Sequence, residues 1–390
     1  MRKYVVLLLS LFAAITHAVE PTIAITSAAQ RYPWNGMVDF TFVITGESGV
    51  KYTPSFVSKD LVGGTDLAMK TIYRVADGMT VSPMDGFEAG TYSLVWDAAS
   101  DLPKGFRCDR VRLEGTVANN LYMVIDLSGG ADATEWPVSY LDNIPEGGWT
   151  DEYKTTKLVL RRISAGADPI GRYILTKDFY MGIFTVTQKQ WGLVMGIACL
   201  QNTTLPISSA THNDIRGVSA GTQWPLSPDV DALSFLGRIR AKTGLIHLDL
   251  PTEAQWEYAC RAGMTSDYNP PDISKAGWTN ADGKGIQAVG KKTPNTWGLY
   301  DMHGNVWEVC LNIPGGYASE EGKASLSGVD PVGSAVGLYG RRTARVWRGG
   351  GSSSYPTSCT ASSRQDGPID SCNTGNASDI VGFRLCNVLP

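Results

Sequence analysis

Histidine is the scarcest chemically active residue in this chain of 390 residues, which contains only four. They stand at His17, His212, His247 and His303, so no two of them lie within one turn of a helix. A zinc or iron site that rests on several imidazole ligands is therefore not expected.

The chain also lacks an excess of charge. Charged residues make up 18% of it, and 34 basic against 38 acidic residues leave a formal net charge of −4. Because nucleic-acid binding requires a concentrated positive surface, no nucleic-acid partner is expected. The 43 glycines and 11 tryptophans favour a loop-rich body with aromatic anchors over a helical bundle.

Long hydrophobic runs are missing except at the N-terminus. Arg2 and Lys3 precede an apolar run over residues 4–15, and Thr16-His17-Ala18 supplies the small residues that signal peptidase recognises. The run is shorter than the ~20 residues that span a bilayer. We predict a cleaved signal peptide over residues 1–18, no transmembrane segment, and a secreted, periplasmic or cell-envelope protein.

Residues 19–127 are predicted to form an antiparallel β sandwich. Apolar residues alternate along two segments, so that each segment has one hydrophobic face: Val38, Phe40, Phe42 and Ile44 in the first, and Tyr92, Leu94 and Trp96 in the second. No catalytic constellation stands out here, which favours a spacer, docking or binding module. Residues 128–155 are rich in glycine and proline and are predicted to be a linker.

Residues 156–388 are predicted to form a second domain of the α+β class. Three helices are expected from their capping residues, from Thr187 to Gly196, from Ser227-Pro228 to Gly244, and from the capping box Thr252–Gln255 to Gly263. No good helix is expected after Gly263, so the rest of the domain should consist mainly of loops and short strands.

Four segments of this domain resemble signatures of the formylglycine-generating enzyme (sulfatase-modifying factor) family. In the family order, they are residues 179–188, residues 250–259 (LPTEAQWEYA), residues 297–308 (WGLYDMHGNVWE), and residues 348–350 with 382–385. The resemblance implies a C-type-lectin-like fold with little regular secondary structure. It does not decide the activity, because the family includes copper-dependent oxidases, iron-dependent enzymes and members that only bind ligands.

Copper oxidase chemistry in this family uses two thiolates that bind Cu(I) shortly after the Arg-Gly-Gly motif. The matching positions here are Ser354 and Cys359. A serine hydroxyl is a poor ligand for this soft ion, so half of the site is missing. Cys359 is a catalytic candidate, and copper a cofactor, only if the oxidase activity survives. The iron branch is not expected, because the N-terminal region after the signal peptide contains no histidine.

The resemblance also implies a structural calcium site. Its ligands would be Asp301, the carbonyls of Gly304 and Val306, and Glu308, which provide the hard oxygen atoms that Ca²⁺ takes. The alternative is a structural turn in which Asn305 and Glu308 bond to the backbone.

Cysteine pairing and the role of two arginines stay open. Seven cysteines leave at least one unpaired. The resemblance implies a Cys260–Cys386 disulfide, and a Cys359–Cys372 disulfide within one loop is the alternative. Arg348 and Arg384 are expected to form ion pairs within the fold rather than to anchor an anionic ligand.

The segment 351–379 is polar and adaptable in composition, like an antibody paratope. Its predicted ligand-binding residues are Ser354, Tyr355, Thr357, Arg364, Asp370 and Asn373. We predict recognition of a glycan, peptide or protein through this segment. Three alternatives stay open: an oxidase that acts on a sulfatase cysteine, a purely structural envelope component, and a segment diversified by a retroelement, as in some relatives.

Overall fold

The computed structural model describes residues 21–32, 35–46, 51–61, 66–74, 81, 86–102, 111–197, 204–208, 210–314, 326–333, 344–368 and 381–389. The predicted signal peptide lies outside these residues. The chain divides into two compact units, Met1–Asn120 and Leu121–Pro390. None of the helices in the described part combines the length and the hydropathy that a membrane span requires.

The first unit is the predicted antiparallel sandwich. One sheet has the order β1 (Thr22–Gln30), β2 (Met37–Thr45), β6 (Gly90–Asp97), β5 (Ile72–Arg74), and the other has the order β4 (Asp66–Ala68), β3 (Thr53–Asp60), β7 (Val111–Ala118). A short helix, α1 (Ala98–Asp101), follows β6. Phe40 and Phe42 of β2 pack edge-on against Phe56 of β3, so the alternating apolar face joins the two sheets.

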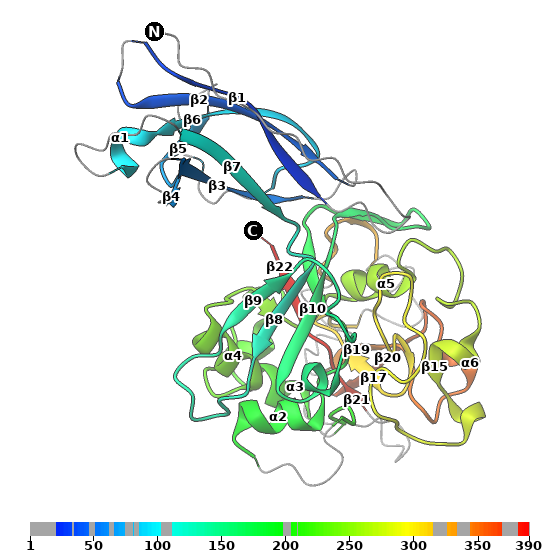
Figure 1. Cartoon of the computed structure of the whole chain (residues 1–390). Coiled ribbons are helices and arrows are strands. Elements are labelled where there is room, and N and C mark those ends of the chain that lie inside the picture. The colour runs from blue at the N-terminus through cyan, green and yellow to red at the C-terminus, as the bar shows by residue number, and fades with distance from the viewer. Residues whose placement is uncertain are drawn as a thin grey trace. The chain divides into compact units, whose positions relative to one another are not determined.

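A six-stranded antiparallel sheet forms the centre of the second unit (Figure 1). Its order is β14 (Leu248–Asp249), β22 (Cys386–Val388), β13 (Phe179–Gly182), β10 (Lys157–Ile163), β8 (Tyr122–Asp126), β9 (Val138–Leu141). The predicted domain boundary at residue 127 and the predicted linker 128–155 are therefore wrong. β8 belongs to this sheet because it pairs with β10, and β9 pairs with β8 in turn.

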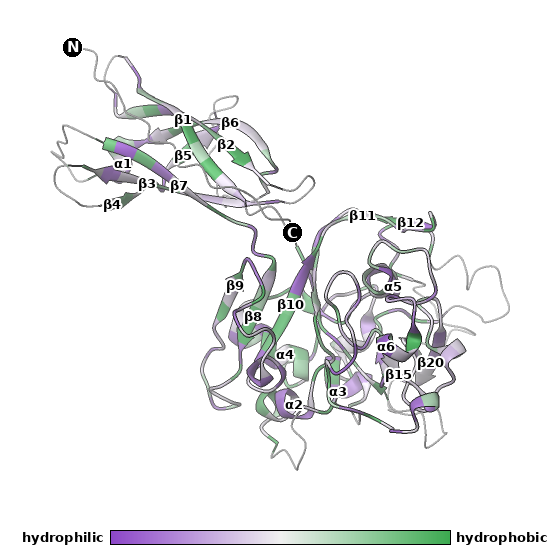
Figure 2. Cartoon of the chain, turned by 45° about the vertical axis from the view of Figure 1, so that its right-hand side comes forward, coloured by the Kyte–Doolittle hydropathy of each residue, from purple (hydrophilic) through white to green (hydrophobic). Residues whose placement is uncertain are grey.

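Helices cover both faces of this sheet. Met123 and Ile125 of β8 face a core shared with α2 (Gln188–Met195), α3 (His212–Arg216) and α4 (Phe235–Thr243). Tyr122 and Val124 face a second core that includes α5 (Glu253–Arg261). Figure 2 shows hydrophobic stretches in β8 and β10, as expected for strands that are buried on both faces, together with a hydrophilic stretch in β10.

The remaining elements are short, in agreement with the predicted α+β class. A second four-stranded sheet has the order β20 (Arg364–Pro368), β19 (Ala344–Arg348), β17 (Trp307–Val309), β21 (Val381–Gly382). The smaller elements are β11 (Gly166–Ala167), β12 (Tyr173–Leu175), β18 (Gly328–Val329), β15 (Gly277–Trp278), β16 (His303–Gly304), α6 (Ile273–Ala276), and the 3-10 turns η1 (Asp151–Lys154), η2 (Ala220–Gln223), η3 (Asn280–Asp282) and η5 (Pro356–Ser358).

Two of the three predicted helix starts are confirmed. Thr187 caps α2, and Thr252 and Gln255 form a reciprocal capping box at the start of α5. The predicted start at Ser227-Pro228 is wrong, because Ser234 caps α4 by accepting a hydrogen bond from the Gly237 N–H. The end of α4 is as predicted, with Gly244 in the left-handed conformation.

Candidate functional site

The family motif on α5 supplies two buried carboxylates, Glu253 and Glu257, one helical turn apart. Arg348 of β19 bridges them, since its Nη2 lies 3.0 Å from Glu253 Oε1 and 2.7 Å from Glu257 Oε2. Arg172 and Arg261 also contact Glu257, with N–O distances of 2.6 and 2.8 Å. Burial alone would raise the pKa of Glu257, but these three guanidinium groups lower it. The motif thus builds a charged framework, in which Arg348 is a structural residue.

A second buried ion pair joins β17 to the segment before β22. Glu308 accepts hydrogen bonds at 2.6 Å from Nε and Nη2 of Arg384 and from the indole N–H of Trp256. Arg384 also donates to the carbonyl of Gly182 at 2.9 Å. Both Glu308 oxygens are therefore occupied by N–H donors and face a positive charge, which is a poor environment for a calcium ligand.

Asp301 is better suited to a cation. Its Oδ2 accepts a hydrogen bond from the Gly290 N–H at 2.7 Å, whereas the buried Oδ1 has no partner among the described residues. Burial raises the pKa of Asp301 to about 6. The described part of the chain holds no cluster of three or more His, Cys, Asp or Glu side chains that could bind a metal. Of the two predicted carboxylate ligands, Asp301 thus fits a cation, and Glu308 in its pairing with Arg384 does not.

The predicted recognition segment begins with a tight turn. The Ser354 N–H donates to the Gly351 carbonyl at 2.9 Å, and the Ser354 hydroxyl accepts from the Gly351 N–H at 3.0 Å. The Asn280 N–H donates to the Ser354 carbonyl at 3.0 Å, and the Tyr268 hydroxyl donates to the Pro356 carbonyl at 2.9 Å. These bonds fix the backbone from both sides, so the segment up to residue 359 has a well-defined backbone conformation.

Two of the predicted ligand-binding side chains extend from this held backbone into solvent. Tyr355 is 70% exposed, and Thr357 on η5 is also exposed. Arg364 is different, because its Nε lies 2.7 Å from the buried Glu253 Oε1 and it therefore belongs to the charged framework. Asp370 and Asn373 lie outside the described residues.

Cys359 carries a free, buried thiol. Burial raises its pKa to about 12, so the thiol is protonated and unreactive at neutral pH. The Nε2 atom of His303 accepts the Asn269 N–H at 3.1 Å, which leaves Nδ1 to donate to the Cys359 carbonyl at 2.7 Å. The residue is thus fixed in the fold by its backbone.

The predicted Cys260–Cys386 disulfide is wrong, because both thiols are free and buried. The Cys260 sulfur lies 3.7 Å from His303 Nε2, and the Cys386 thiol donates to Gln255 Oε1 at 3.7 Å. They contact different neighbours because Cys386 lies on the strand face turned toward Gln255. Cys372 lies outside the described residues, and Cys359 is free.

Trp307 is a feature of the site that the sequence does not reveal. Its buried indole N–H has no partner among the described residues. A Cβ atom placed on Gly351 would lie 3.6 Å from that nitrogen and 3.8 Å from the Ser354 hydroxyl oxygen. A buried hydrogen-bond donor that has no partner among the described residues thus borders the turn. The sequence predicts a core tryptophan here, with carbohydrate stacking as the alternative, because an unsatisfied N–H has no signature in the motif.

The fold and this site define a class of protein. Residues 144–389 match the family described as "Sulfatase-modifying factor enzyme 1-like domain", and the chain belongs to that family.

Particular relatives match shorter stretches. The formylglycine-generating enzyme of Thermomonospora curvata is 32% identical over 154 residues, which are 35% of this chain and 48% of that enzyme. The chaperone protein LppX of Paenibacillus barcinonensis is 27% identical over 176 residues, 35% of this chain and 63% of LppX. The chain thus spans between about half and two thirds of these relatives.

Two solved structures are also similar. The Treponema denticola variable protein 1 covers 60% of this chain and 95% of its own, with a TM-score of 0.43 and 23% identity. PvdO from Pseudomonas aeruginosa covers 62% and 97%, with a TM-score of 0.43 and 19% identity.

Proposed function

We propose that this chain is an exported recognition module that binds a glycan, peptide or protein ligand at the surface of residues 351–359. The observation that carries the proposal is the buried indole N–H of Trp307, which has no partner among the described residues and lies beside the Gly351–Ser354 turn. A buried donor without a partner costs free energy, and a ligand whose binding uncovers this N–H would recover that energy by accepting its hydrogen bond. Tyr355 supplies a large exposed side chain in the same segment, on a backbone that is already held in place.

The oxidase alternative has less support. Cu(I) binding in this family uses two thiolates, and Ser354 stands at one of the two positions with its hydroxyl engaged in the turn. Cys359 is present, but its raised pKa disfavours the thiolate that copper binds.

A binding screen tests the recognition proposal. The purified protein is applied to a printed glycan array, to a peptide array and to an immobilised cell-envelope extract. We expect a hit whose signal is lost in Tyr355→Ala and in Trp307→Phe, which keeps an aromatic ring but removes the N–H. Tyr32→Ala, an 87% exposed tyrosine of the other unit, is the matched control and should bind normally. Hits that both site variants retain would rule out this surface.

A turnover assay separates recognition from oxidation. Protein, Cu(I) and oxygen are incubated with a peptide that carries Cys-x-Pro-x-Arg, and the aldehyde product is measured by mass spectrometry. We expect no product from the native chain. Aldehyde from the native chain would establish oxidase activity. Aldehyde from Ser354→Cys alone would show that the native chain has a copper site that lacks one of its two thiolates.

Structural calcium at the Asp301 turn is part of the proposal, and the unpartnered Oδ1 of Asp301 supports it. Calcium should raise the melting temperature, and Asp301→Asn should abolish that rise. If chelation leaves the melting temperature unchanged and elemental analysis finds no calcium, then this turn holds no structural calcium.

A further inference from the structure

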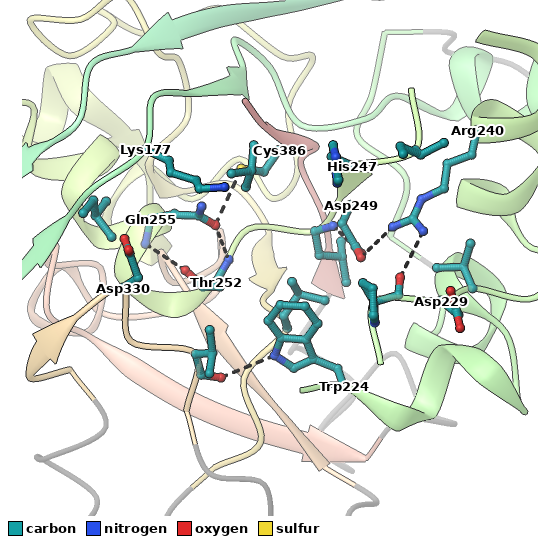
Figure 3. A pocket seen from close by; sticks show the side chains of 18 of the residues that line it. Lys177, Trp224, Asp229, Arg240, His247, Asp249, Thr252, Gln255, Asp330 and Cys386 are labelled. Atoms are coloured by element: carbon teal, nitrogen blue, oxygen red, sulfur yellow. Dashed lines mark hydrogen bonds and ion pairs between the residues drawn. The ribbon is translucent and has the colours of Figure 1, made fainter. Parts of the chain in front are cut away.

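A cavity of about 700 Å³ lies in the second unit, between the loop 224–232, α4, the segment 246–252 and β22 (Figure 3). This volume is typical of pockets that bind small molecules. Among the described residues that line it, none comes from the segment 351–368, so the cavity is separate from the proposed recognition surface.

The walls of this cavity are largely apolar. Ile246 and Val332 line it and remain 66% and 40% exposed, which leaves apolar surface that a ligand can cover. Trp224 adds a half-buried indole, whose N–H donates to the Val332 carbonyl at 3.3 Å. Leu175 and Val388 complete an apolar lining that can take a hydrocarbon or aromatic body.

Two hydrogen-bond donors at one end of the cavity have no protein partner among the described residues. They are the ammonium group of Lys177 and Nε2 of Gln255, and Figure 3 shows both side chains at the same end, beside Cys386. Gln255 is held in this orientation because its Oε1 accepts the Thr252 N–H at 2.9 Å and the Cys386 thiol at 3.7 Å. The amide nitrogen is therefore left as an oriented donor.

Three carboxylates, those of Asp229, Asp249 and Asp330, also line the cavity. Asp249, at the other end, is 2.9 Å from both Arg216 and Arg240, so its charge is compensated by two guanidinium groups. Asp330 accepts hydrogen bonds from the N–H and the hydroxyl of Thr176. An incoming anion at the Lys177 end therefore meets a cation that forms no ion pair among the described residues, with the Asp330 carboxylate at the same end of the cavity.

We propose that this cavity binds an amphipathic anion. An apolar body would lie against Ile246, Val332 and Trp224, and a single carboxylate or sulfonate would accept hydrogen bonds from Lys177 and Gln255. This is a second binding site, and it does not depend on the recognition surface at residues 351–359.

Two fluorescent probes test the proposal on the full chain. 8-Anilinonaphthalene-1-sulfonate is an aromatic anion, and N-phenyl-1-naphthylamine is its neutral counterpart. We expect saturable binding of one equivalent of the anion. Lys177→Gln should weaken the anion about three- to fivefold, the size of a partly exposed ion pair, and leave the neutral probe unchanged. Lys291→Gln, an exposed lysine outside the cavity, is the matched control.

Two cavity-filling variants locate the binding site. Ala232 is exposed and lines the cavity, so Ala232→Trp should weaken both probes at least tenfold. Val332→Trp fills the cavity from another wall and should also weaken both probes. It replaces the first variant if Ala232→Trp does not fold. Tyr355→Ala should bind both probes normally. The proposal is overturned if the filled variants bind like the native protein, or if Lys177→Gln leaves the affinity for the anion unchanged.

Discussion

Buried arginine residues form ion pairs on which the stability of the second unit depends. Arg348 is 1% exposed and contacts Glu253 and Glu257, which are themselves fully buried. Removal of one member of such a group leaves uncompensated charge in a medium that solvates it poorly. The cost of a substitution here should therefore exceed that of a surface ion pair by several kcal/mol.

We predict that Arg348→Ala lowers the free energy of unfolding by about 3–5 kcal/mol. Urea denaturation followed by circular dichroism measures this change. The matched control is Lys275→Ala, whose side chain is 70% exposed and lies 3.6 Å from Asp272. This control should cost less than about 1 kcal/mol. Equal effects of the two substitutions would show that the buried framework has no special role.

His212 gives the second prediction at this scale. Burial, together with Arg345 and Arg216, lowers the pKa of His212 well below its usual value, and neither ring nitrogen has a partner among the described residues. Below about pH 6.5 the unfolded chain binds a proton at this position and the folded chain does not. The stability contributed by the neutral ring is therefore complete above that pH and is lost as the pH falls.

We expect His212→Leu to flatten the decline of the unfolding free energy between pH 7 and pH 5. Leucine cannot bind a proton, so one source of the pH dependence disappears. His247→Leu, a substitution of an exposed histidine, should leave the decline as it is in the native protein. Parallel curves for the native chain and His212→Leu would exclude this histidine as the source.

At the level of single residues, the sequence predicts which residues are binding candidates better than it predicts whether their side chains already have a partner within the fold. It identifies Tyr355 and Thr357 as exposed binding candidates, and the structure places both at the surface. It fails at Arg364 and Trp307, because their roles depend on partners that are distant in the chain. Arg364 pairs with Glu253, and the N–H of Trp307, which has no partner among the described residues, lies beside Gly351.

Among the elements, helix α5 depends on its first turn. Thr252 and Gln255 satisfy each other's backbone donors, and the helix carries the two carboxylates of the charged framework. Thr252→Ala should lower the free energy of unfolding by about 1 kcal/mol, as for other N-caps. Thr265→Ala, at an exposed position just after the helix, should change it by less than about 0.5 kcal/mol. Thermal denaturation of both variants measures the difference.

Local patterns predict those elements whose signals lie within a few residues. The sandwich strands follow from alternation, and the caps at Thr187 and Thr252 follow from side chains that bond to their own backbone. The start of α4 is mispredicted because Ser227-Pro228 and Ser234 offer similar local signals. Tertiary contacts make the choice, since Asp231 receives the N–H groups of Ser219 and Ala220 and holds the preceding loop away from the helix.

For the whole molecule, the position of the domain boundary has a direct test. A fragment of residues 121–390 keeps β8, which lies between β10 and β9, whereas a fragment of residues 128–390 removes it. We predict that the first fragment unfolds cooperatively. The second should be unfolded or partly aggregated, because β9 loses its only neighbour in the described sheet and one edge of β10 loses its hydrogen-bonding partner. Similar melting curves for the two fragments would restore the boundary at residue 127.

The strand order also decides when this unit can fold during synthesis. β22 (Cys386–Val388) lies between β13 and β14, which precede it by well over a hundred residues, so the central sheet cannot be completed until β22 itself has left the ribosome. Contacts so distant along the chain slow folding and leave strand edges exposed in the meantime. The second unit of a nascent chain therefore stays incompletely folded until β22 has been synthesised, even though the first unit is complete much earlier.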